Sequence, residues 1–65
     1  MDEFSVLTRE RVTRYRQAAA DARERARKAE TGELRESHLL VAQEWIQLAN
    51  ELEYEILTGR ARASA

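Results

Sequence analysis

The sequence predicts an all-α protein, an antiparallel two-helix hairpin that pairs with a second copy into a dimeric four-helix bundle. First, the 65 residues contain no proline, only two glycines and many strong helix formers. Second, apolar residues recur at intervals of three and four on both sides of Gly32, as the buried stripe of a helix requires. Third, a chain this short with no cysteine needs another chain to complete its core.

The first helix is expected over about residues 5–30. Within it, apolar positions recur with spacings of 3, 4, 3, 4 and 3, the a/d seam of a coiled coil. The seam consists of Val12, Tyr15, Ala19, Ala22, Ala26 and Ala29. The helix is expected to end at a turn of residues 31–32, because glycine is typical of helix ends.

The second helix is expected over about residues 33–58. Thr31 should cap its start, because a threonine hydroxyl accepts a free backbone N–H of the first turn. Gly59 should end it, and residues 60–65 should form a frayed tail of the single domain 1–65. Its seam, with spacings of 4, 3, 4, 3 and 4, consists of Leu34, His38, Val41, Trp45, Leu48 and Leu52.

The two seams match as an antiparallel pair. The step from Ala29 to Leu34 is five residues, which breaks the register of a continuous helix and favours folding back at the turn. In every facing pair the residue numbers then sum to 63 or 64, and most pairs set an alanine against a larger side chain. The predicted hairpin core is Val12, Tyr15, Ala19, Ala22, Ala26, Leu34, Val41, Trp45, Leu48 and Leu52.

The second helix carries another apolar seam that its partner helix cannot cover. Together the two seams span roughly half of the helix circumference, whereas one facing helix covers a stripe of about 100°. The second seam is Leu39, Ala42, Ile46, Ala49 and Ile56. We expect it to bind the same face of a second copy with C2 symmetry, or else a helix of a different protein. Glu53 also falls in this seam, where it could set the register or pair with an arginine.

The charge is unevenly placed, and a basic half and an acidic half can attract each other if they pack side by side. Residues 9–28 hold eight basic residues against three acidic ones, and residues 30–55 hold seven acidic residues against one basic residue. The predicted function is a non-enzymatic module for protein–protein interaction or oligomerisation. The alternative is a small dimeric nucleic-acid-associated regulator that uses the basic first helix. No nucleic-acid partner is expected, because the net charge is −1 and the arginines point at many angles.

No residue pattern indicates catalysis, a cofactor or a metal. His38 is the only histidine, and Arg35 stands where the Glu-x-x-His motif of a diiron site needs glutamate. His38 is therefore expected to be structural, bonded to a carboxylate such as Glu30. The acidic N-terminus is not typical of a secretory signal, and no apolar run approaches the roughly 20 residues that span a bilayer. We expect a cytoplasmic protein that does not bind membranes.

One set of residues carries a family resemblance. Tyr15-Arg16 is followed by Ala19 and Ala20, then by a polar turn, and then by Leu39-x-x-Ala42-x-x-Trp45-x-x-Leu48-Ala49. This pattern resembles a group of short alanine-rich helical-hairpin proteins of unknown function that are common in alphaproteobacteria. The resemblance covers about residues 12–53. It implies a helical hairpin in a bacterial cytoplasm, and it carries over no catalytic or ligand-binding residue.

Overall fold

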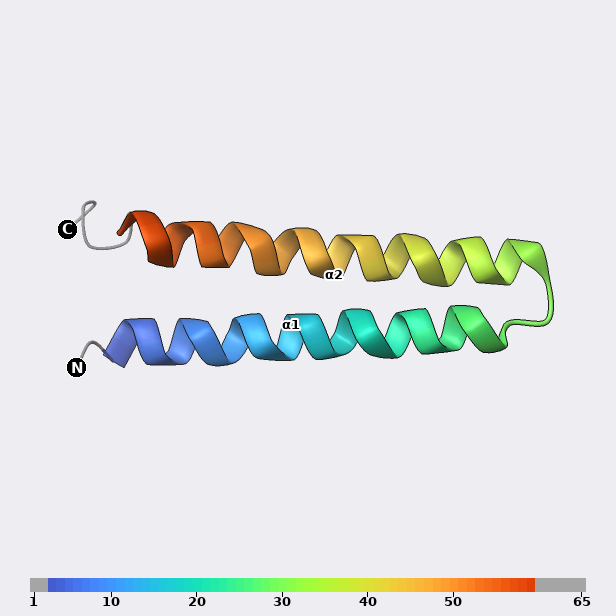
Figure 1. Ribbon diagram of the computed structural model, residues 1–65, viewed down its shortest axis with the longest axis horizontal. Helices are drawn as coiled ribbons and strands as arrows, with labels where there is room; N and C mark the ends of the chain where they lie inside the picture. Colours follow the sequence, from blue (N-terminus) through green and yellow to red (C-terminus); the bar gives the residue numbers. More distant parts are fainter. Residues whose placement is uncertain (1–2, 60–65) are drawn as a thin grey trace.

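The computed structural model describes residues 3–59, which form two helices, α1 (Glu3–Lys28) and α2 (Gly32–Thr58). The helices lie side by side and run in opposite directions, joined by a short turn (Figure 1). The predicted all-α hairpin is therefore confirmed. α1 begins and ends two residues earlier than predicted, and α2 begins one residue earlier. The predicted tail, residues 60–65, lies outside the described residues.

The hairpin is a flat rod. It measures 48 × 17 × 12 Å along its principal axes, and its radius of gyration is 14.8 Å. A compact domain of this length would have a radius of gyration of about 11 Å. The shortest dimension matches the diameter of one helix, about 10–12 Å. The two helices thus form a single layer, and neither broad face of that layer is covered.

The turn uses the cap that the sequence predicts. Thr31 has an extended backbone, with φ −127° and ψ 157°, and its hydroxyl accepts a hydrogen bond from the Leu34 N–H at 3.1 Å. The backbone N–H of Arg35 donates to the Thr31 carbonyl at 3.0 Å, closing the first turn of α2. Gly32 differs from the prediction, because it is the first residue of α2 rather than the end of α1.

Gly59 ends α2 as predicted. Its backbone is left-handed, with φ 69° and ψ 24°, a conformation that glycine adopts without a steric penalty. Its N–H donates to the carbonyl oxygens of Glu55 at 3.0 Å and Ile56 at 3.3 Å. Two carbonyls that the end of the helix would leave unpaired therefore have a partner.

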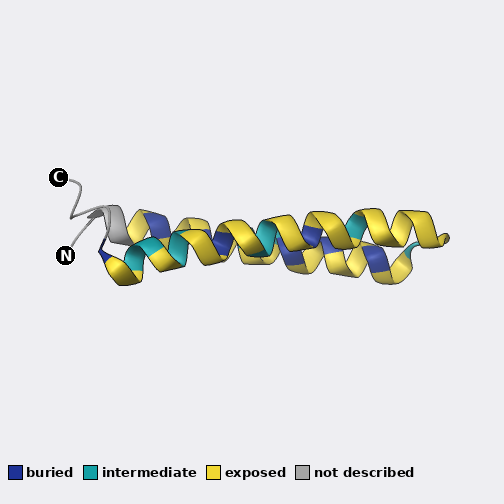
Figure 2. Ribbon diagram, turned by 90° about the horizontal axis from the view of Figure 1, so that it is seen from above, coloured by how far each residue is buried: buried dark blue, intermediate teal, exposed yellow. Residues whose placement is uncertain are grey.

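Small side chains fill the contact between the helices. The buried apolar residues are Val12, Ala19, Ala22, Ala26, Ala42 and Ala49. Thr8 is also buried and extends the α1 seam toward its N-terminus. Figure 2 shows the buried positions as short separate segments among intermediate and exposed ones along both helices. Within the described part of the chain, no large side chain is fully buried, so the hairpin encloses little apolar volume.

The α2 side of the contact corrects the predicted seam. Leu34, Val41 and Leu48 are 50%, 41% and 44% exposed, so the prediction that they belong to the hairpin core was wrong. Ala42 and Ala49, which the sequence assigns to the outer seam, are 2% and 0% exposed. The facing seam, again with spacings of 4, 3, 4, 3 and 4, is His38, Ala42, Trp45, Ala49, Leu52 and Ile56.

The physical reason for this shift is the size of the side chains at the contact. The α1 seam is largely alanine, and small side chains on both helices let their axes approach closely. A seam through Ala42 and Ala49 allows that approach, whereas Val41 and Leu48 at the same positions would hold the helices apart. The larger residues consequently lie beside the seam. Tyr15 and Trp45, both predicted for the core, are half-buried.

Neither α1 nor α2 combines the length and the hydropathy that a membrane-spanning helix requires.

Candidate functional site

α2 presents large apolar side chains on both sides of its buried alanines. Leu34, Val41 and Leu48 recur in steps of seven and form one row, which we call the Val41 face. Leu39 and Ile46 are also seven residues apart and form a second row, which we call the Leu39 face. At about 100° per residue, the two rows lie on opposite sides of the seam. The hairpin therefore has one exposed apolar row on each of its broad faces.

The Val41 face continues into a pair of aromatic rings. Trp45 lies four residues after Val41 and three before Leu48, which places it on the same side of α2. Its ring contacts that of Tyr15 on α1, with centroids 5.3 Å apart and planes tilted by 42°. Such tilted geometry is favourable because of the ring quadrupoles. The antiparallel pairing predicted from the sequence, with residue numbers summing to 63 or 64, sets Tyr15 against Leu48 and Trp45 against Ala19, so it did not predict this contact.

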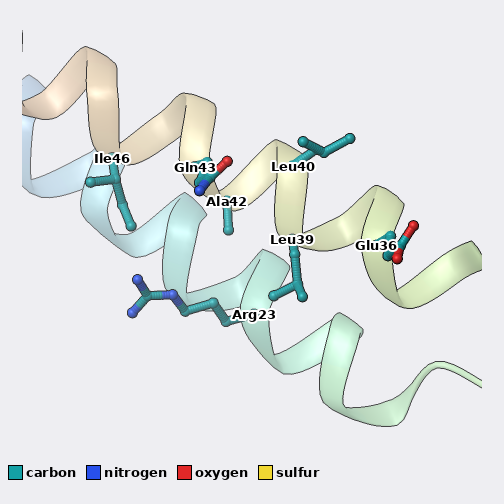
Figure 3. A pocket seen from close by; sticks show the side chains of 7 residues that line it. All are labelled: Arg23, Glu36, Leu39, Leu40, Ala42, Gln43 and Ile46. Carbon is teal, nitrogen blue, oxygen red and sulfur yellow. The ribbon is translucent and has the colours of Figure 1, made fainter. Parts of the chain in front are cut away.

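The Leu39 face contains a shallow groove between the helices. Leu39, Ala42 and Ile46 line it from α2, together with Glu36, Leu40 and Gln43. Arg23 lines it from α1, and Leu40 points away from α1 at its upper rim (Figure 3). The aliphatic residues give the groove an apolar floor, but Arg23 makes one wall charged. Sequence reasoning did not place Arg23 at this site.

The residues predicted for the interface with another chain are thus divided by the structure. Ala42 and Ala49 are inside the hairpin and unavailable to a partner. Ile46 and Ile56 are half-buried, and Leu39 is 44% exposed. Leu34, Val41 and Leu48 join the accessible set instead. The spacing of apolar residues in α2 allows the observed seam as well as the predicted one, because both follow intervals of 4, 3, 4, 3 and 4 residues.

Within residues 3–59, one ion pair joins the basic and acidic helices. Arg16 donates a hydrogen bond from its guanidinium to the carboxylate of Glu53, and both side chains are about half exposed. This contact confirms that Glu53 can pair with an arginine. It lies on the same broad face as Leu39 and Ile46, because Glu53 follows Ile46 by seven residues.

The other ion pairs of the described residues lie within α1. Glu24 accepts hydrogen bonds from Arg27, and the Lys28 ammonium lies 3.6 Å from the same carboxylate. The hydrogen bonds from Arg27 hold the pKa of Glu24 below its ordinary value, and the charges of Arg27 and Lys28 act in the same direction. These charges are exposed, so they stabilise the last turn of α1 only modestly.

His38 is half-buried at the turn end of the seam. Among the described residues, no hydrogen bond joins His38 to Glu30, so the structure does not show the bond that the sequence analysis expected. Over residues 3–59, no group of three or more histidine, cysteine, aspartate or glutamate side chains is placed to hold a metal ion. The accessible features of the site are therefore its apolar faces and their charged rims.

Comparison of the chain with protein-family models, with curated proteins and with solved structures finds no match. The resemblance to the alphaproteobacterial hairpin proteins accordingly stays a prediction.

Proposed function

We propose that the protein is an oligomerisation module in which two hairpins pack through the Val41 face into a four-helix bundle. One observation carries the proposal: alanines occupy the hairpin contact while Leu34, Val41 and Leu48 are exposed. Full burial of such a side chain contributes roughly 1.5–3 kcal/mol relative to leaving it in water. A small domain gains little from an alanine core, so this row supplies apolar area that the hairpin alone lacks.

The flanking row of α1 favours the Val41 face over the Leu39 face. Beside the Leu39 face, α1 presents three arginines in steps of seven, Arg9, Arg16 and Arg23. Beside the Val41 face, the equivalent row is Arg11, Ala18 and Arg25, so its middle member is the half-buried Ala18 and its arginines lie toward the two ends. Arg16 pairs with Glu53, but covering the Leu39 face would also bury Arg23, at the middle of the groove, and burial of a guanidinium without a partner is costly. Ala18 and the Tyr15–Trp45 ring pair therefore give the Val41 face a centre that a second copy can cover.

Sedimentation equilibrium of the full chain tests the proposal. We expect a dimer, and we expect Val41→Glu and Leu48→Glu each to raise its dissociation constant about a hundredfold or more, because one charge is buried per copy. Leu40→Glu is the matched control. It adds the same charge to the same helix at a position that is 62% exposed and points away from α1.

Three results would count against the proposal. A wild-type chain that remains monomeric at high micromolar concentration would overturn it. Equal effects of Leu40→Glu and Val41→Glu on the dissociation constant would show that the dimer does not form through the Val41 face. Dissociation by Leu39→Glu but not by Val41→Glu would assign association to the Leu39 face. Helical circular dichroism of each variant, measured at matched concentration, separates loss of association from loss of the hairpin.

A further inference from the structure

The two long edges of the hairpin carry opposite charge. On the rim of the Val41 face, α1 presents Arg11 and Arg14 and α2 presents Glu51 and Glu55. In the described part of the chain, the only ion pair between the helices is Arg16–Glu53, which lies on the other broad face. The charges around the Val41 face are therefore available to a partner, and their opposite signs discriminate between the ways in which a second copy can dock.

A C2 dimer formed through one broad face has two possible orientations. If the two turns lie at the same end, α1 of each copy lies along α2 of the other. If the turns lie at opposite ends, α1 lies along α1 and α2 along α2. The first orientation sets basic edges against acidic edges, and the second sets like charges against each other. Like charges across an interface disfavour an association, so the charge pattern selects between them.

We propose that two copies associate through the Val41 face with their turns at the same end, so that each basic α1 lies along the acidic α2 of the second copy. This inference rests on the proposed function. Both orientations make all neighbouring helices antiparallel, as in an up-down bundle, so the charge pattern is what selects between them. Arg11 of one copy lies within about one helical turn of the level of Glu51 and Glu55 of the other, because these residues are nearly equidistant from the turn. Arg14 lies within about one helical turn of the level of Glu51.

A distance measurement between spin labels tests this orientation. One label per chain would be attached to the variant Glu30→Cys, at an exposed position beside the turn. The distance between the labels of the two copies would be measured by pulsed electron paramagnetic resonance. Turns at the same end should give a distance below about 30 Å, since only the width of two helices and the labels separates them. Turns at opposite ends should give about 40 Å or more, the length of a 27-residue helix.

A label at the far end of α1 supplies the matched control. Glu10→Cys labels should also lie close together, whereas a dimer mixed from Glu10-labelled and Glu30-labelled chains should give a longer distance, because positions 10 and 30 lie about 30 Å apart along the rod. The reverse pattern would overturn the proposed orientation while leaving the dimer in place. Labelled chains that sediment as monomers and show no distance between copies would overturn the proposed function as well.

Discussion

Gly32 and Gly59 stand beside helix ends but differ in backbone conformation. Gly59 has φ 69°, a left-handed conformation in which a Cβ atom is strained. Gly32 has no positive φ, and a Cβ added there meets no atom within 4 Å. The left-handed backbone thus requires glycine at position 59, whereas nothing in the fold requires it at position 32.

Replacement by alanine should change the stability of the protein in opposite directions at Gly32 and at Gly59. Gly32→Ala should raise the free energy of unfolding by about 0.4–1 kcal/mol, because alanine lowers the entropy of the unfolded chain and fits the helical backbone. Gly59→Ala should lower it by about 1 kcal/mol, because alanine is strained in the left-handed region. Urea titrations followed by circular dichroism measure both values. Equal changes would show that the two backbones do not differ as described.

At the scale of the helices, the hairpin depends on close contact through alanine. Ala42 and Ala49 lie between two rows of larger residues, so the helices meet along the smallest side chains of α2. The ring pair of Tyr15 and Trp45 and the ion pair of Arg16 and Glu53 add contacts on either side of that line. The position of the seam is therefore the feature of α2 that a substitution can test most directly.

Enlarging a buried alanine should separate the helices. Ala49→Leu should lower the free energy of unfolding by about 1–3 kcal/mol, the usual cost of forcing extra methylene groups into a packed contact. Ala20→Leu, at an exposed position of α1, is the matched control and should change stability by less than about 0.5 kcal/mol. Thermal and urea unfolding give both values. If Ala49→Leu instead stabilises the protein, Ala49 faces another chain, as the sequence alone predicts.

At the scale of the whole molecule, a flat layer of two helices has much surface and little interior. The shortest dimension is 12 Å, so every residue lies close to solvent on at least one broad face. A second layer on the Val41 face would cover Leu34, Val41 and Leu48 and make folding dependent on association. Linkage then requires that dilution lower the stability of the folded state.

The melting temperature should therefore rise with protein concentration. We expect the melting temperature, followed by circular dichroism, to increase steadily with protein concentration, because only folded chains form the dimer. For Val41→Glu the melting temperature should be lower and independent of concentration. A wild-type melting temperature that does not change on dilution would contradict coupled folding and assembly.

The sequence by itself determined the local structure of this protein. Residue preferences within one or two turns are sufficient to place both helices to within two residues, to predict the cap at Thr31 and to end α2 at Gly59. Because each of these features depends on backbone hydrogen bonds or dihedral angles of near neighbours, composition and spacing predict them. The fold-back at the turn also followed, from the five-residue step between Ala29 and Leu34.

Only the tertiary structure decided which strip of α2 faces α1. The apolar arc of α2 is wider than one helix can cover, so the heptad spacing fits a seam through Val41 and Leu48 as well as one through Ala42 and Ala49. The choice depends on the shapes of both helices at once, because two alanine-lined surfaces approach more closely than an alanine surface and a valine–leucine row. That choice also determines which apolar residues remain on the surface, and hence where the candidate interface lies.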